Sequence, residues 1–170
     1  MHKNYRGDFS DGFDDENITM HFKTAINKYR FHAYITLRRE KGDAGTMVRA
    51  RLKSAFANVV DLCEGVLEMK IAHDQFFNIA ICGMEKTWGT FDVTDNKITI
   101  NEKLLDGDLR NFERTVFHEI MHYLFVWLHD QILKGRNWFS LLSEAVTRYF
   151  ENMYYPDGGI SEELLTDRAN

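Results

Sequence analysis

Two histidines and a glutamate lie within one short stretch of the sequence, His118-Glu119-Ile120-Met121-His122. On an α-helix, side chains four residues apart lie on the same face, separated by one turn or about 6 Å. His118 and His122 can therefore both reach a single zinc ion at about 2.0–2.1 Å. Glu119 lies about 100° around the helix from His118. This places its carboxylate beside the ion, where it can take a proton from zinc-bound water.

The surroundings of this stretch favour a buried site. A helix is predicted to begin after Asp108, whose side chain suits an N-cap, and to run to about His129. Between Val116 and Leu128 the helix is apolar on nearly all sides, which is typical of a helix inside a fold. Two imidazoles and a carboxylate are costly to bury without a compensating partner. We therefore predict one Zn²⁺ ion per chain.

A catalytic zinc usually takes three protein ligands and leaves the fourth position for water. His129 lies seven residues beyond His122, about 10 Å further along a continuous helix, and is too far to share the ion. The other known arrangement, a glycine turn followed by a third histidine, would need glycine at position 125 and histidine at position 128. These positions hold Phe125 and Leu128, so that class of site is excluded. Glu144, in a second apolar helix predicted over 138–154, is the expected third ligand. Its apolar neighbours favour this over the alternative, an exposed helical glutamate.

These residues resemble a known family. HEIMH followed by a glutamate in a second helix resembles the gluzincin branch of zinc metallopeptidases. The stretch from Leu142 to Glu151 is similar to the L-N-E-G-F-A-x-Y block of the aminopeptidase N group, in which that glutamate binds zinc. Gly89–Val93 and Lys97–Asn101, just before the motif helix, resemble the strand hairpin of small intracellular zincins of the SprT-like and ImmA/IrrE-like kinds. The resemblance covers about 76–155.

The resemblance implies hydrolysis of a peptide bond in a protein or peptide substrate, by an endopeptidase rather than an aminopeptidase. Zinc would lower the pKa of its bound water, and Glu119 would take the water's proton and deliver it to the leaving amine. An oxyanion also needs a second donor, for which the candidates are Tyr149, Tyr154, Tyr155 and Arg148. The alternative is a zincin-fold protein that binds zinc for interaction or regulation without turnover. The intact Glu119 favours the enzyme.

The sequence also differs from the families that it resembles. SprT-like proteins use a third histidine where this chain offers Glu144. Thermolysin-like enzymes carry, four residues after the glutamate ligand, an aspartate that orients a ligand histidine, but this position holds Arg148. Asp92, Asp130 or a backbone carbonyl is expected to orient the histidine instead. An extended substrate would pair with an edge strand, and 76–82 and 88–93 are the predicted edges.

Hydrophobic spacing predicts the remaining elements. Ile18, Phe22, Ile26 and Tyr29 repeat at helical spacing, and 31–40 fits either a strand or a continuation of that helix. The other expected elements are an amphipathic helix over 46–72, a buried strand over 76–81, and a hairpin formed by 88–93 and 97–101 around a turn at 94–96.

Together these elements predict an α+β, minimal zincin-like fold. A small, mostly antiparallel sheet is expected to pack on the buried HExxH helix and the ligand helix that follows it. Residues 1–45 are interpreted as an N-terminal leader, mobile over 1–16, with an appended helix or strand. Residues 46–170 are interpreted as the zincin-like domain, and the two parts are expected to form one compact unit.

Composition narrows the remaining functions. The chain has 170 residues, 44% of them hydrophobic, with 13 Phe and one Pro, which indicates a globular domain with long regular elements and a bulky core. A net charge of −5 makes nucleic acid an improbable partner, and the basic residues between Arg38 and Lys53 are interpreted as a solvated face. Cys63 and Cys82 are expected to be reduced, buried thiols. The chain lacks an apolar run that could cross a membrane and is predicted to be cytoplasmic.

Overall fold

A computed structural model of the chain describes residues 16–132 and 139–156, with side chains described up to Phe125 and again from Glu144. Five strands are present: β1 (Asn17–Ile26), β2 (Tyr29–Arg38), β3 (Asp74–Cys82), β4 (Gly89–Asp92) and β5 (Lys97–Asn101). The α-helices are α2 (Gly45–Asp61), α3 (Leu109–Ile132) and α4 (Phe139–Tyr154). Short helical turns occupy Arg39–Ala44, Leu62–Val66 and Glu102–Leu105.

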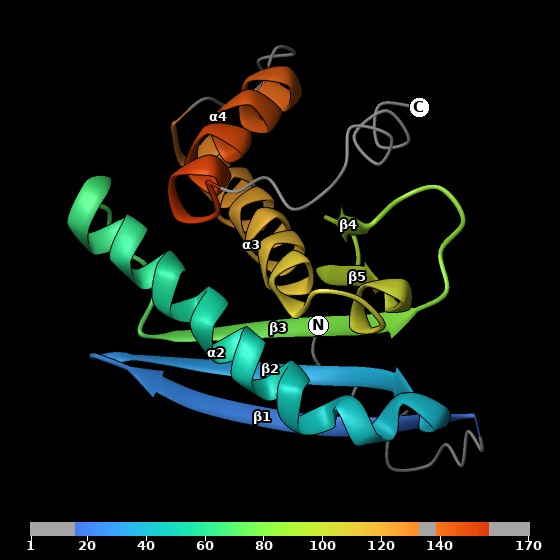
Figure 1. The fold of residues 1–170 in the computed structure, drawn as a ribbon. Coiled ribbons are helices and arrows are strands. Elements are labelled where there is room, and N and C mark those ends of the chain that lie inside the picture. Colours follow the sequence, from blue (N-terminus) through green and yellow to red (C-terminus); the bar gives the residue numbers. More distant parts are fainter. Residues whose placement is uncertain (1–15, 133–138, 157–170) are drawn as a thin grey trace.

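The strands form one sheet in the order β1-β2-β3-β5-β4. The outer pairs, β1 with β2 and β4 with β5, are antiparallel, and β3 pairs in parallel with both β2 and β5. The helices lie on one side of this sheet (Figure 1). α2 lies across the strands at the β1 end of the sheet, α3 lies against β4 and β5, and α4 packs on α3. The predicted α+β class is therefore confirmed.

The helix predicted from Ile18 to Tyr29 is wrong, because these residues form the strand β1 and the start of β2. Asn27, with φ of 54°, makes the tight turn between the two strands. A spacing of four residues fits both a helix and a two-residue strand period. In β1 the residues that pack against the core are Ile18, Met20, Phe22 and Ile26, which is the strand period.

The other predicted elements are present. α2 ends at Asp61 and continues as a π-helical turn to Val66, so it is shorter than the predicted helix over 46–72. The hairpin of β4 and β5 is closed by Asp92, whose Oδ1 accepts hydrogen bonds from the backbone N–H groups of Thr94 and Asp95. Asp108 caps α3 as predicted, because its Oδ1 accepts a hydrogen bond of 2.9 Å from the Arg110 N–H.

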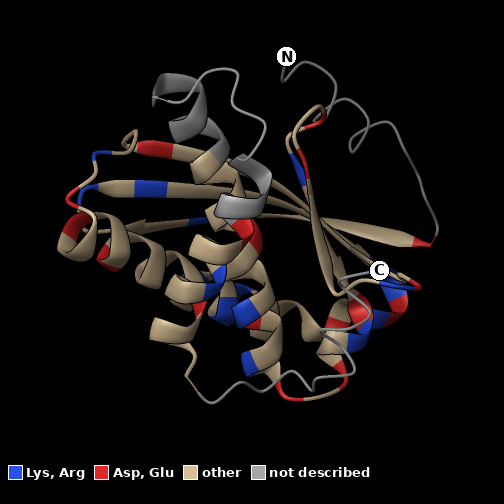
Figure 2. Cartoon of the chain, turned by 90° about the horizontal axis from the view of Figure 1, so that it is seen from above, with Lys and Arg blue, Asp and Glu red and all other residues tan. Residues whose placement is uncertain are grey.

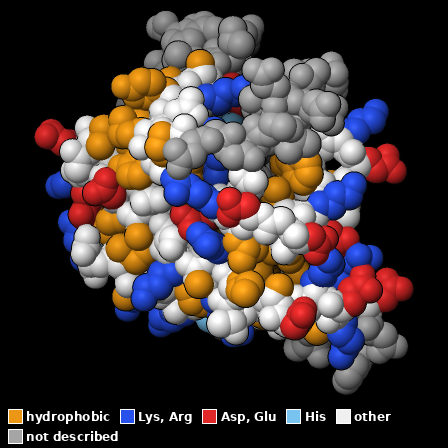
Figure 3. Space-filling view, viewed as in Figure 1, with side chains coloured by type: hydrophobic (Ala, Val, Ile, Leu, Met, Phe, Trp, Pro, Cys, Tyr) orange, Lys and Arg blue, Asp and Glu red, His pale blue; other side chains and the backbone are white. Residues whose placement is uncertain are grey.

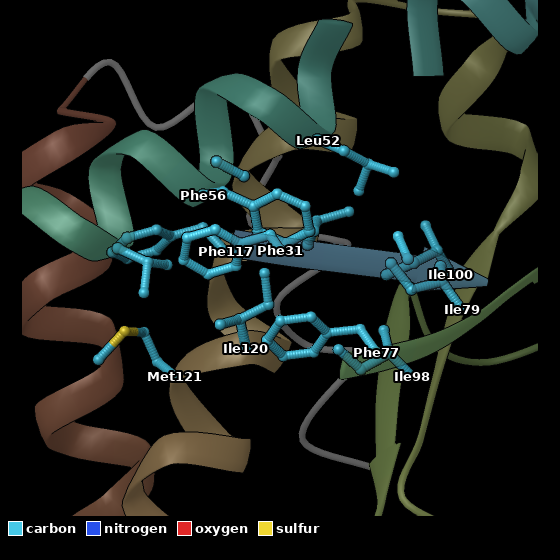
Figure 4. Packing of buried hydrophobic residues seen from close by; sticks show 14 of the residues in the cluster. Phe31, Leu52, Phe56, Phe77, Ile79, Ile98, Ile100, Phe117, Ile120 and Met121 are labelled. Carbon is cyan, nitrogen blue, oxygen red and sulfur yellow. The ribbon is translucent and has the colours of Figure 1, made fainter. Parts of the chain in front are cut away.

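The core lies between the sheet and the helices (Figure 4). Phe31 of β2, Phe56 of α2 and Phe77 of β3 stack on one another, with ring centroids 4.6 and 5.4 Å from Phe56. Phe117 and Ile120 of α3 are also fully buried in this cluster. Burying large side chains on both sides of α3 holds its middle turns, where the motif lies, against the sheet. β1 and β2, from the region interpreted as an appended part, thus belong to the same sheet and core.

One of the two predicted edge strands is wrong. Residues 76–82 belong to β3, which lies between β2 and β5, whereas β4 is at an end of the sheet order as predicted for 88–93. β3 is flanked by β2 and β5, and its side chains Phe77, Ile79 and Ile81 are buried in the core.

Charged side chains of both signs are intermixed over the ribbon and on the face shown in the space-filling view (Figures 2 and 3). Part of the basic cluster after β2 is paired: Arg38 contacts Glu40 and Glu102, and Lys41 contacts Asp106. Cys63 is buried and Cys82 half-buried, both as free thiols, and burial raises the pKa of Cys63 to about 11. Among the described residues, none of the helices has the length and apolar character needed to span a bilayer.

Candidate metal centre

The two histidines of the motif lie on the face of α3 that meets α4. His118 is almost fully buried, and the Nε2 atoms of His118 and His122 are 3.0 Å apart. The neighbours Phe117, Ile120 and Met121 are fully buried on the other faces of the helix. The apolar faces of α3 therefore fix its rotation so that both imidazoles point towards α4.

Glu144 reaches the two histidines from α4. Its Oε2 lies 2.9 Å from His122 Nε2, and its Oε1 lies 3.4 Å from His118 Nε2. His118, His122 and Glu144 form the group of three side chains that could hold a metal ion among the described residues. The helix pair brings together the three ligands predicted from the sequence.

The three side chains lie close enough together to share one zinc ion. Ligand atoms at about 2.0–2.1 Å from a tetrahedral ion lie about 3.3 Å from one another. The two Nε2 atoms are 3.0 Å apart, and Glu144 approaches them through different oxygens, Oε2 at 2.9 Å from His122 and Oε1 at 3.4 Å from His118. One ligand atom from each residue lies within 4.8 Å of the other two. Two imidazole nitrogens and one carboxylate are also a donor set common in catalytic zinc sites. The residues present therefore fit the ion by both distance and chemistry.

Hydrogen bonding dominates the electrostatics of the group. Burial opposes protonation of His118, but hydrogen bonds to Glu144 and Glu151 outweigh it and raise the pKa of His118 to about 9. Hydrogen bonds from His118 and His122 hold the pKa of Glu144 far below its usual range, against the effect of burial. The carboxylates of Glu144, Glu151 and Glu119 therefore make the surroundings of His118 negative, which also favours a bound cation.

Glu119 lies at the side of the group that faces β4. It is buried, with 4% of its surface exposed. A Cβ atom placed on Gly89, the first residue of β4, would lie 3.2 Å from both Cγ and Oε1 of Glu119 and 2.7 Å from Cγ2 of Thr115. The absence of a side chain at residue 89 therefore lets the edge strand pass directly against the predicted catalytic carboxylate.

The carboxylate hydrogen-bonded to His118 is Glu151, which was not among the residues expected to orient the ring. Its Oε2 accepts a hydrogen bond of 2.7 Å from His118 Nδ1, so the Nε2 atom of the ring faces His122 and Glu144. Asp92, one expected candidate, instead accepts the hydrogen bonds of the β4–β5 turn. The side chain of Asp130, the other, lies outside the described part of the chain. The spacing of seven residues between Glu144 and Glu151, two helical turns, could have indicated this role.

Three of the four residues considered as oxyanion donors lie against other groups or point outwards. The Tyr154 hydroxyl donates a 2.6 Å hydrogen bond to Asp61, and the Tyr155 hydroxyl donates one of the same length to Glu113. Tyr149 is 64% exposed. Arg148 lies next to the ligand group, because its Nε donates a 3.0 Å hydrogen bond to Glu144 Oε1.

Comparison of the chain with protein-family models, with curated proteins and with solved structures finds no match.

Proposed function

We propose that this chain is a zinc-dependent peptidase that cleaves an internal peptide bond of a protein or peptide. One observation carries the proposal: the ligand atoms of His118, His122 and Glu144 lie within 4.8 Å of one another, and the buried carboxylate of Glu119 lies beside them against an edge strand. A site that only held zinc would have no use for a general base at residue 119.

His118, His122 and Glu144 would hold the zinc. When bound, zinc would act as a Lewis acid that polarises the scissile carbonyl and lowers the pKa of the attacking water. Glu119 accepts one proton from the attacking water as the water oxygen bonds to the carbonyl carbon. Glu119 then delivers that proton to the amide nitrogen as the C–N bond breaks, leaving a carboxylic acid and an amine. Arg148, which lies against Glu144, is the candidate of the four that could supply positive charge to the developing oxyanion.

The position of β4 supports an extended substrate. β4 ends the strand order, so an added peptide strand can pair with its outer edge by β-augmentation. Because Gly89 lies against Glu119, a peptide paired with β4 would run close to the predicted base. Main-chain pairing of this kind needs an unfolded segment of substrate, and it favours loops or denatured proteins over folded surfaces.

Replacement of Gly89 by alanine tests the close approach of β4 to α3. The added Cβ would lie 2.7 Å from Thr115 Cγ2, a short side chain that cannot turn away, so β4 must shift. We expect Gly89→Ala to lower peptide hydrolysis by about 10-fold or more, because a shift of about 1 Å in positioning can cost as much as 100-fold, and to leave zinc content unchanged.

Thr115→Ser provides the matched partner for this variant. Serine lacks the Cγ2 atom but keeps the hydroxyl that donates to the Asn111 carbonyl oxygen at 2.8 Å. Adding Thr115→Ser to Gly89→Ala is expected to restore part of the activity. Unchanged turnover in Gly89→Ala would show that this contact does not place the substrate.

The proposal is tested by cleavage of a peptide library and of a denatured protein, with products identified by mass spectrometry. We expect cleavage by the zinc-loaded protein, loss of cleavage with a zinc chelator, and recovery when about one equivalent of zinc is added back.

Two results would contradict it. Zinc bound at one ion per chain without any cleavage would favour the non-catalytic zinc-binding alternative. Cleavage that persists with chelator would indicate a different catalytic group or a contaminating protease.

A further inference from the structure

A row of buried polar side chains is connected to His118, one of the predicted metal ligands. Arg114 of α3 contacts Glu151 of α4 through its Nε and the Glu151 Oε1, and Glu151 contacts His118 through its other oxygen. The Glu151 side chain is 3% exposed and that of Arg114 11%. Both oxygens of one carboxylate are therefore engaged, one by a guanidinium and one by the imidazole of a predicted metal ligand.

Helical spacing explains why these groups meet. Arg114, His118 and His122 follow one another at four-residue steps on α3, and Glu144 and Glu151 are two turns apart on α4. The two helices run antiparallel, since Arg114 contacts Glu151 and Asn152 whereas His122 contacts Glu144. The polar side chains thus form a ladder across the helix pair, with the three predicted ligands at one end.

Charge explains why the ladder has this order. Burial would raise the pKa of Glu151, but its hydrogen bonds to His118 and Arg114 outweigh burial and keep the pKa below its usual range. An anion buried this deeply requires the Arg114 cation close by. A carboxylate that accepts the Nδ1–H of a ligand histidine fixes the ring's orientation and leaves Nε2 as the metal donor.

Arg114 also forms hydrogen bonds at the C-terminal end of α4. Its Nη2 donates to Asn152 Oδ1 at 2.9 Å, and its Nη1 donates to the Tyr155 carbonyl oxygen at 3.3 Å. One side chain on α3 therefore contacts Glu151 and Asn152 in the last turn of α4 and Tyr155 just after it. Only arginine can donate from three nitrogens in this way, because the lysine side chain has a single nitrogen.

We propose that Arg114 and Glu151 are positioning residues for the metal, with Arg114 acting through Glu151 to hold His118 in the orientation that presents Nε2. The proposal rests on the zinc site of the proposed function. It extends that function to a pair of residues on two helices, neither of which contacts the ion or the substrate.

Zinc affinity, measured by competition with a chromophoric chelator, tests the proposal without depending on turnover. Glu151→Gln keeps the size of the side chain and an acceptor but removes its charge, and we expect zinc affinity to fall about 10–100-fold. Arg114→Gln should lower the affinity in the same way. Because both act on one group, the double variant should lose about as much as Glu151→Gln alone.

Two further variants separate positioning from folding. Thr147→Val lies in the same interface, where Thr147 is fully buried and its hydroxyl has no partner among the described residues, so its zinc affinity should match the wild type. Arg114→Lys keeps the positive charge beside Glu151 and should retain more affinity than Arg114→Gln. If Glu151→Gln does not fold, the contrast between the two Arg114 variants still decides.

Cobalt substitution gives a readout that a purely structural role would not change. A weaker His118 donor should shift the visible absorption bands of the Co²⁺-loaded Glu151→Gln variant, whereas Thr147→Val should keep the wild-type spectrum. Wild-type zinc affinity in a folded Glu151→Gln variant would overturn the positioning role, and additive losses in the double variant would overturn the order of action. A wild-type protein that binds zinc but does not cleave peptides would instead contradict the proposed function alone.

Discussion

Glutamine at residue 119 is expected to abolish turnover while leaving the metal in place. Glu119→Gln preserves the size of a side chain that is 4% exposed and lies against Gly89, so the packing of β4 on α3 should not change. The amide cannot accept the proton of the attacking water, and loss of a general base costs about 10²–10⁴-fold in rate. Zinc content should stay at about one ion per chain, measured by atomic absorption beside the initial rate of peptide cleavage.

Glu113→Gln is the matched control for this variant. Glu113 lies on the same helix and is 6% exposed, but its carboxylate accepts a hydrogen bond from Tyr155 and lies outside the ligand group. A glutamine there can still accept that hydrogen bond, so activity should stay close to the wild type. Full activity in Glu119→Gln would remove the proposed base and, with it, the proposed mechanism.

Alanine at residue 144 is expected to remove the metal. Glu144 contacts both histidines, at 2.9 and 3.4 Å, and no other carboxylate belongs to the group that could hold an ion among the described residues. Loss of a direct ligand should exceed the 10–100-fold effect of removing an orienting partner. We expect zinc content after dialysis to fall from about one ion per chain to below about 0.1, with complete loss of hydrolysis.

Thermal unfolding gives an independent measure of the same variant. A ligand that binds the folded state stabilises it by RT ln(1 + [L]/Kd). Added zinc should therefore raise the Tm of the wild type and of Met153→Ala, which changes a side chain on the exposed side of α4. Glu144→Ala should show little increase. An equal increase in all three proteins would place the zinc elsewhere.

The juxtaposition of His118 and His122 could be predicted from sequence because its geometry is local. Four residues of helix fix the distance between His118 and His122, and the apolar residues around them fix the face that is buried. Glu144 could be predicted because few carboxylates lie among apolar residues in a helix long enough to fold back. The structure brings Glu144 within hydrogen-bonding distance of both histidines, as expected.

Glu151 and Arg114 could not be predicted in the same way. Which turn of α4 lies opposite His118 depends on the offset between two antiparallel helices, and that offset is set by contacts over the whole interface. The fit of Gly89 against Glu119 likewise depends on how a four-residue edge strand crosses a helix. These are tertiary relations, and one sequence specifies them only through the packing of many side chains.

The N-terminal strands show a different limit. Ile18, Phe22 and Ile26 are spaced by four residues, which fits both helix and strand, and the choice depends on the partner β2. The alternation of Phe31, Ala33, Ile35 and Leu37 in β2 gives that partner a fully buried face. The tertiary pairing therefore decides between two structures that the local pattern fits equally.

The parallel pairing at the centre of the sheet has a consequence for folding kinetics. β2 and β3 align residues such as Arg30 and Asp74, which lie 44 positions apart and are joined through α2. Closing a loop of this length is slow. We expect the pairing of β2 and β3 to form first, because together they provide part of the core face on which α3 packs. The predicted zinc ligands lie on α3 and α4, which we expect to dock afterwards. Zinc is therefore expected to slow unfolding far more than it speeds folding, so that it prolongs the lifetime of the native state rather than guiding its formation.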